Sequence, residues 1–169
     1  MLCTLWYASP LGRMLLAAED GRLVGAWFEG QRFFPNDRCA SMAGSPMPVL
    51  DAACFWLDGY FSGKEPRVLP PMRLSSTPFR MAVWRRLLRI PYGRTETYGR
   101  IAAEMTPEGQ GTMAAQAVGC AVGRNPLAVF VPCHRVVGAG GRLTGYAGGL
   151  SKKSFLLELE KKNACRREG

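Results

Sequence analysis

The sequence predicts an α+β protein in which a small N-terminal antiparallel sheet with a helix precedes a C-terminal winged helix-turn-helix domain. Three observations favour this fold class. Short apolar runs broken by turn residues fill residues 3–30, which is typical of strands. Apolar residues at helical spacing recur in the second half of the chain. The net charge of +9 is confined to that second half.

The charge distribution divides the chain. Residues 1–77 carry seven basic and seven acidic side chains, whereas residues 78–169 carry fifteen basic and six acidic ones. This balance is typical of a polyanion-binding module attached to a scaffold, although a merely soluble basic surface would give the same numbers. The proline-rich segment 65–78 coincides with the charge shift. We therefore predict a scaffold domain over 1–77 and a polyanion-binding domain over 78–169.

The first half is predicted to contain strands and one helix. Two turns, Ser-Pro and Asp-Gly, interrupt the apolar runs of residues 3–30 and suit a hairpin. Residues 31–45 are predicted to form a loop. Residues 45–63 are predicted to be helical because Leu50 and Leu57 fall on one apolar face.

The second half is predicted to contain a series of helices and loops. A helix begins at Pro78 and ends near Arg89, with Thr77 as its cap. A short helix follows from about Thr97, and a glycine-containing break separates it from a helix of small residues over 112–123. An apolar extended run, a glycine-rich hairpin-like segment and a last helix then follow, over residues 125–137, 138–150 and 151–163. This order fits a winged helix-turn-helix.

The helix over residues 112–123, the second of the helix-turn-helix, is unusual for a protein that reads DNA sequence. It offers Ala114, Ala115, Gln116 and Gly119, whereas helices that read base edges usually present several long polar side chains. Small side chains would let the helix backbone approach DNA of any sequence. Tight packing inside a core would explain the same composition equally well.

A cysteine and the only histidine of the chain are adjacent at Cys133 and His134. A thiol reacts as its thiolate, and an imidazole or a helix N-terminus lowers its pKa. Each residue could instead be an ordinary core residue. Because neighbours on an extended strand point to opposite faces, a turn at Pro132 or a bridging water would be needed to connect them. Glu160 shares a helix face with Leu156, so it is the candidate to orient the imidazole, unless it is a solvated terminal residue.

Metal, membrane and cofactor chemistry are not expected. Six cysteines without a CxxC pair and a single histidine leave few zinc-ligand sets, so we expect reduced thiols in a cytoplasmic protein. No apolar run is long enough for a membrane span, and no basic segment followed by an apolar one marks a signal peptide.

The motifs around Cys133 resemble those of a known family. "PCHRV", with "NP" eight residues before the cysteine, "TGYAGGL" after it and "LLELE" near the end, resembles the O6-alkylguanine-DNA alkyltransferases. "PFRMAVWRRLLRIPYGRTETYGRIA" is similar to their DNA-binding domain. The resemblance is strong over residues 78–162 and weaker over 1–77, where "SPLG" and "LDGYFSG" fit the bacterial branch.

This resemblance implies a repair reaction. Cys133 would take the alkyl group irreversibly from O6 of guanine in double-stranded DNA, once per molecule, after the damaged base is flipped out of the duplex. His134 would act as a base through a water, and Glu160 would orient it. Asn125 would brace the turn that links the helix over 112–123 to the active-site strand. Tyr98 would donate a proton to the departing guanine.

The resemblance also implies pocket and DNA-contact residues. Val136 would contact the base edge, and Tyr146 and Ala147 would form the other pocket wall. The residues expected to contact DNA are Arg94, Thr97, Ala114, Ala115, Gln116, Gly119 and Ser151. Further candidates for phosphate contact are Arg85, Arg86, Arg89, Arg100, Lys152 and Lys153. Gln116 departs from the family, which usually has arginine there, so slower repair or weaker duplex binding is expected.

Two other functions stay open on the sequence. One is a non-enzymatic lesion binder of the alkyltransferase-like kind, although those proteins lack the acceptor cysteine. The other is a thiol hydrolase that uses Cys133, His134 and Glu160. For the repair reaction we expect no cofactor and no metal, and a monomer, with cooperative assembly along DNA as the alternative.

Overall fold

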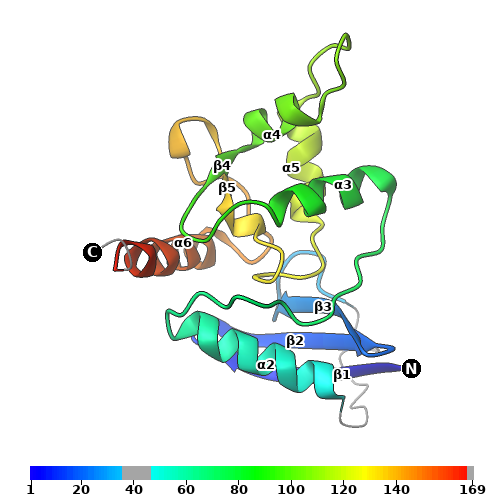
Figure 1. Cartoon of the computed structure of the whole chain (residues 1–169), viewed down its shortest axis with the longest axis vertical. Coiled ribbons are helices and arrows are strands. Elements are labelled where there is room, and N and C mark those ends of the chain that lie inside the picture. Colours follow the sequence, from blue (N-terminus) through cyan, green and yellow to red (C-terminus); the bar gives the residue numbers. More distant parts are fainter. Residues whose placement is uncertain (36–46, 167–169) are drawn as a thin grey trace. The chain divides into compact units, whose positions relative to one another are not determined.

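The computed structural model describes residues 1–35 and 47–166, and the chain divides into two compact units (Figure 1). The first unit is Met1–Ser75 with Pro126–Phe130, and the second is Ser76–Asn125 with Val131–Gly169. The predicted loop over 31–45 lies mostly outside the described residues. The predicted domain boundary after residue 77 remains a prediction.

The first unit is a three-stranded antiparallel sheet covered by one helix. Strands β1 (Leu2–Ser9), β2 (Gly12–Glu19) and β3 (Arg22–Phe28) pair in sequence order. Helix α2 (Pro48–Phe61) packs against this sheet, as Figure 1 shows. Its buried residues are Val49, Leu50, Ala53, Trp56, Leu57 and Tyr60. The predicted strands and the predicted helix are confirmed.

A short segment from the second half of the sequence completes this unit. The amide of Ala26 in β3 donates to the carbonyl of Pro126 at 2.8 Å, and the Ala128 amide donates to the carbonyl of Ala26 at 2.9 Å. The prediction of an extended strand through this segment is wrong. Val129 has a φ of 72°, a conformation that β-branched residues rarely adopt, so the chain turns here before it reaches Cys133.

The second unit is mainly helical. Helix α3 (Pro78–Leu87) begins after Thr77, whose hydroxyl accepts a hydrogen bond from the Arg80 amide, and it ends slightly before the predicted Arg89. The remaining regular elements are β4 (Glu96–Thr97), α4 (Tyr98–Met105), α5 (Ala115–Gly123), β5 (Val136–Val137) and α6 (Leu150–Cys165). Strands β4 and β5 pair in parallel.

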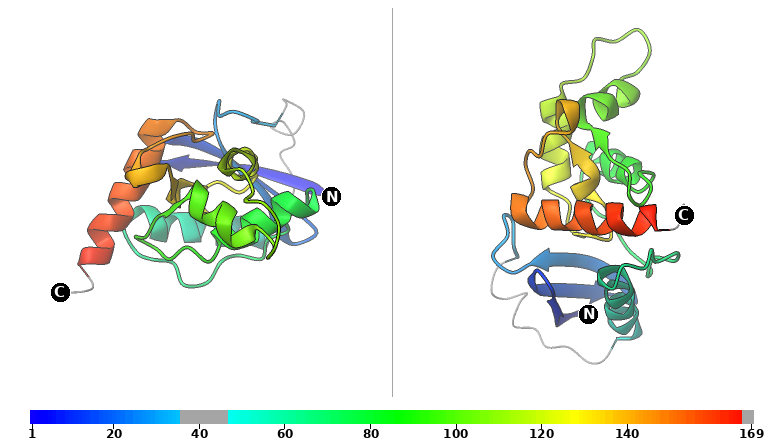
Figure 2. Two further views of the ribbon diagram at one scale, coloured as in Figure 1. Left: turned by 90° about the horizontal axis from the view of Figure 1, so that it is seen from above. Right: turned by 90° about the vertical axis from the view of Figure 1, so that its left-hand side faces the viewer.

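Helices α4 and α5 form the predicted helix-turn-helix and pack against each other (Figure 2). The Thr106 hydroxyl closes the base of the connection between them, since it donates to the Ala102 carbonyl at 2.8 Å and accepts from the Met113 amide at 2.9 Å. The glycine-rich segment after β5 is a loop that the Gly138 amide closes by donating to the Arg142 carbonyl. The α+β fold class is thus confirmed.

Candidate active site

Cys133 lies in a tight turn rather than on a strand. Residues Cys133–Arg135 form one turn of 3-10 helix after Pro132, and the Cys133 amide donates to the Val131 carbonyl at 2.8 Å. The Asn125 side-chain amide donates to the same carbonyl at 2.9 Å, which fixes the start of this turn. Cys133 is 6% exposed and His134 is fully buried.

Glu160 is the partner of His134. Its carboxylate accepts a hydrogen bond from Nε2 of His134 at 2.7 Å, and it is fully buried, so the alternative of a solvated terminal glutamate is wrong. Burial alone would raise the pKa of Glu160, but hydrogen bonds and charges from His134 and Arg135 lower it to about 2. Burial lowers the pKa of His134 and outweighs the opposite effect of Glu160, so the imidazole is neutral and can accept a proton.

The thiol of Cys133 is surrounded by groups that stabilise its ionised form. Burial raises the pKa of Cys133, and the Asn125 side chain, the charge of Lys153 and the turn's own amides oppose this increase. An imidazole or a helix N-terminus was expected to activate the thiol. The structure adds the side chains of Asn125 and Lys153 to these groups, and both lower the pKa of Cys133.

Lys153 is a site residue that sequence reasoning missed. It was expected to contact phosphate, but it is fully buried, and its Nζ donates to the carbonyls of Val136, Thr144 and Gly145 at 2.5, 3.0 and 3.0 Å. Burial lowers its pKa to about 8, and the nearby thiol of Cys133 opposes this shift. The signal that could have found it is helical spacing, because Lys153 lies seven residues before Glu160 on the same buried face.

Two tyrosines complete the surroundings of the sulfur. The Tyr98 hydroxyl donates to the Thr144 carbonyl at 3.1 Å and lies 3.5 Å from Nζ of Lys153. Burial, followed by the charge of Cys133, raises the pKa of Tyr98, so this hydroxyl keeps its proton at neutral pH. Burial and the Cys133 side chain raise the pKa of Tyr146 well above its ordinary value.

The sulfur is closed off in this structure. Tyr98 and Lys153 both bond to the loop at Thr144, and Lys153 also bonds to Gly145, so these contacts hold the loop beside Cys133. The repair reaction implied by the resemblance requires a sulfur that a flipped base can reach, whereas Cys133 is only 6% exposed in this structure.

A thiol-modification experiment tests this closure. With iodoacetamide and no DNA, we expect the exposed thiols of Cys120 and Cys165 to react well before that of Cys133, which is buried and has a raised pKa. Peptide mass spectrometry over a time course gives the order. Labelling of Cys133 as fast as that of Cys120 would show that the sulfur is open in the free protein.

The expected DNA-contact residues differ in exposure. Ala114, Ala115 and Gln116 are exposed at the start of α5, whereas Val118 and Ala121 are buried. Close approach to DNA and tight core packing, the two explanations for the small residues of this helix, therefore apply to different faces. Its exposed first turn is available for DNA, and its opposite face packs into the core.

Other expected contacts are distributed over the second unit. Thr97 is half-buried and caps α4, while Arg94 and Ser151 are exposed. Gly119 lies behind Tyr98, because a Cβ at Gly119 would meet the Tyr98 ring at 3.8 Å. Among the pocket residues Val136 is buried, and Tyr146 and Ala147 are partly exposed.

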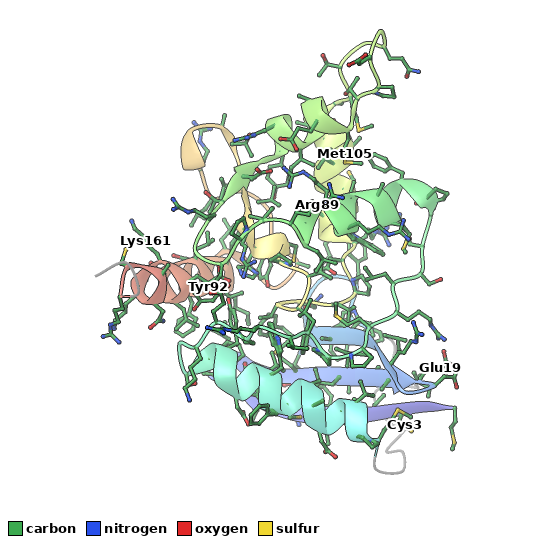
Figure 3. All side chains as sticks on the ribbon, viewed as in Figure 1. Cys3, Glu19, Arg89, Tyr92, Met105 and Lys161 are labelled. Carbon is green, nitrogen blue, oxygen red and sulfur yellow. The ribbon has the colours of Figure 1, made fainter. Side chains whose placement is uncertain are left out.

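The arginines of α3 and the adjoining turn are not equivalent. Arg85 and Arg89 are exposed, and Figure 3 labels Arg89 close to the end of α3. Arg86 instead lies between two carboxylates, with Nη2 2.5 Å from Glu96 and 2.6 Å from Glu104. Its charge is already compensated, so it is a weaker candidate for phosphate contact than its neighbours.

The described part of the chain contains no group of three or more histidine, cysteine or acidic residues that could hold a metal ion. No helix within residues 1–35 and 47–166 is long and apolar enough to cross a membrane.

Comparisons with known proteins agree with this geometry. Residues 78–162 match the family described as "6-O-methylguanine DNA methyltransferase, DNA binding domain". A relative from Methanosarcina mazei named methylated-DNA–protein-cysteine methyltransferase is 50% identical over 158 residues, covering 92% of this chain and 94% of the relative. A relative of the same name from Mycobacterium tuberculosis is 41% identical over 157 residues, covering 92% and 90%.

Solved structures extend the similarity to most of the chain. The crystal structure of the O6-methylguanine methyltransferase of Mycobacterium tuberculosis superposes with a TM-score of 0.82 at 39% identity, covering 96% of this chain and 94% of that one. A structure of the Mycobacterium tuberculosis protein in complex with DNA superposes with a TM-score of 0.80 at 38% identity, covering 96% and 93%. The similarity thus covers nearly the whole chain, and the chain belongs to the methylated-DNA–protein-cysteine methyltransferase family.

Proposed function

We propose that this protein repairs DNA by moving an alkyl group from O6 of guanine to the sulfur of Cys133, once per molecule. Its relatives carry the name of this activity, and one similar structure contains DNA. The observation that carries the proposal is the setting of the thiol. Cys133 lies beside Asn125 and Lys153, and the adjacent His134 is paired with Glu160 at 2.7 Å.

In the proposed reaction the thiol gives its proton through a water to His134. The sulfur forms a bond to the alkyl carbon, and the bond from that carbon to O6 breaks with its electron pair leaving on the guanine. Substitution at carbon suits a soft thiolate. Tyr98 donates its hydroxyl proton to the departing base. His134 later releases the proton it accepted to solvent, and Tyr98 takes one back from solvent. A thioether is stable to water, so the acceptor stays alkylated.

The proposed substrate is double-stranded DNA that contains an alkylated guanine. The reacting atom is inaccessible in a stacked duplex, so the nucleotide must be flipped out at a cost of a few kcal/mol. The small, exposed residues Ala114 and Ala115 allow α5 to approach the duplex closely. Gln116 would occupy the gap that the flipped nucleotide leaves in the duplex. We propose that the protein acts as a monomer in the cytoplasm, where thiols are kept reduced.

Intact-protein mass spectrometry after incubation with a duplex that contains O6-methylguanine tests the proposal. We expect the mass to increase by one methyl group in place of one hydrogen, with the change located on Cys133 and not formed by Cys133→Ala. Binding without a change of mass would support the lesion-binding alternative. Indifference to DNA, together with turnover of a thiol-ester substrate, would support the hydrolase alternative.

The Gln116→Arg variant tests the role of the exposed turn of α5. We expect faster single-turnover repair and tighter duplex binding, because arginine adds a charge and stacks better in the gap left by the flipped base. The measurements are the repair rate and the dissociation constant at several salt concentrations, with Gln110→Arg in the preceding connection as the control. If Gln116→Arg changes neither quantity, Gln116 does not lie at the gap.

A further inference from the structure

We infer that Arg135 is a positioning residue for the transfer reaction: its guanidinium holds the Glu160 carboxylate in one orientation, so that His134 can only present Nδ1 to the reacting thiol. This inference rests on the roles proposed above for Cys133 and His134. Arg135 follows them directly in the turn, and neither the sequence analysis nor the family resemblance assigned it a role.

Arg135 holds both oxygens of the carboxylate. Its Nη2 donates to Oε1 of Glu160 at 2.9 Å, and its Nε donates to Oε2 at 2.9 Å. This bidentate arrangement fixes the carboxylate plane as well as its charge, which a lysine ammonium could not do. The third nitrogen, Nη1, donates to the Ile90 carbonyl at 2.7 Å, and the guanidinium lies 5.7 Å from the centre of the Tyr92 ring.

The loop after α3 supplies the fourth donor to Glu160. The Gly93 amide donates to Oε2 at 3.0 Å. Gly93 has a φ of 75°, and a Cβ at this position would lie 2.7 Å from that of Ala164 on α6. Glycine is therefore required for this loop to approach the helix closely enough for the bond. Arg135 and Gly93 together connect this loop to α6 at Glu160.

The donor count determines the tautomer of the imidazole. A carboxylate offers about four lone-pair positions, and those of Glu160 receive donors from His134, Gly93 and, twice, Arg135. Glu160 is thus ionised and only accepts, so the hydrogen between it and His134 belongs to Nε2. The buried Nδ1 is then the basic atom of the neutral ring. Because Arg135 stabilises the carboxylate, a proton taken from the thiol stays on His134.

The charges around His134 allow this role to be measured. Glu160 and Lys153 face the imidazole from α6, Arg135 and Cys133 belong to its own turn, and Tyr146 from the glycine-rich loop faces Cys133 and Glu160. The positive charges of Arg135 and Lys153 lower the pKa of His134, while Glu160 raises it. Loss of Arg135 should therefore raise the pKa of His134.

The test compares Arg135→Gln and Arg135→Lys with the unchanged protein. Because the chain has one histidine, its ¹⁵N-labelled imidazole gives a single set of NMR signals that report tautomer and pKa without DNA. For Arg135→Gln we expect loss of the pure Nε2–H tautomer and an upward shift of the His134 pKa by about one unit or more. We expect the single-turnover rate to fall about 10- to 100-fold, as for other residues that orient a reacting group. Arg135→Lys keeps the charge, so it should restore the pKa more than the rate.

Arg13→Gln is the matched control, because Arg13 also holds a carboxylate, that of Glu29, outside this site. It should leave the His134 signals and the rate unchanged. A folded Arg135→Gln variant with a slower rate but unchanged His134 signals would overturn the inference and make Arg135 merely structural. If Arg135→Gln does not fold, the His134 tautomer of Arg135→Lys decides, because lysine keeps the charge but cannot hold both carboxylate oxygens. A slower rate with an unchanged tautomer in Arg135→Lys would overturn the inference. If the unchanged protein shows the expected His134 tautomer and pKa shifts but fails to accept methyl groups, the proposed function is contradicted instead.

Discussion

Replacing Lys153 with methionine is expected to slow alkyl transfer about 100- to 1,000-fold, the loss typical for removal of one preorganised electrostatic contact in an active site. Lys153 is a fully buried cation whose charge stabilises the ionised thiol of Cys133. Methionine has a similar length and shape but no charge. Only the Asn125 side chain and the turn amides would then offset the effect of burial on the pKa of Cys133. A smaller fraction of the thiol would therefore be ionised.

The measurement is the single-turnover rate with saturating O6-methylguanine duplex, with Lys162→Met as the control. Lys162 lies on the same helix but is exposed, so its replacement should leave the rate nearly unchanged. Lys153→Met also leaves the carbonyls of Val136, Thr144 and Gly145 without their donor, which should cost about 1–3 kcal/mol of stability. Urea unfolding measures that loss separately. A folded Lys153→Met variant with an unchanged transfer rate would show that the cation only supports the loop.

Replacing Glu160 with glutamine should lower the free energy of unfolding by about 3–5 kcal/mol, because it leaves the guanidinium of Arg135 and its surroundings without the buried countercharge. It should also slow transfer, since the amide can no longer hold His134 in one tautomer and stabilise its protonated form. Glu158→Gln is the control. Glu158 is exposed on the same helix and accepts a hydrogen bond from the Ser154 hydroxyl at 3.1 Å.

The pH dependence of stability gives a second readout for Glu160. Its pKa is about 2 in the folded protein, whereas a glutamate in an unfolded chain has a pKa of about 4.3. The folded state therefore binds fewer protons in this range, and the stabilisation is complete above about pH 4.3 and is lost as the pH falls towards 2. We expect Glu160→Gln to flatten the unfolding free energy in this window. A curve parallel to that of the unchanged protein would mean that Glu160 is not the ionised acceptor described here.

Local patterns predicted much of the fold because they follow from short-range physics. The apolar face of α2, the threonine caps of α3 and α4, and the position of Glu160 beside Leu156 are all readable from residue spacing. The turn at Val129 was not readable. An apolar run that includes valines favours a strand. Hydrogen bonds between Ala26 and the residues just before Val129, Pro126 and Ala128, hold the segment where the chain turns.

The sequence by itself predicted the fold class, singled out Cys133 and His134 as a candidate thiol and imidazole, and gave Glu160 as the candidate to orient the imidazole. The tertiary structure alone decided that Lys153 is a buried cation beside the sulfur, that Arg135 holds Glu160, and that Tyr98 closes the loop at Thr144. The physical reason is that a charged side chain has the same local preferences on a surface as in a site. Whether its charge is solvated or serves the chemistry depends on carbonyls and carboxylates that distant segments bring to it.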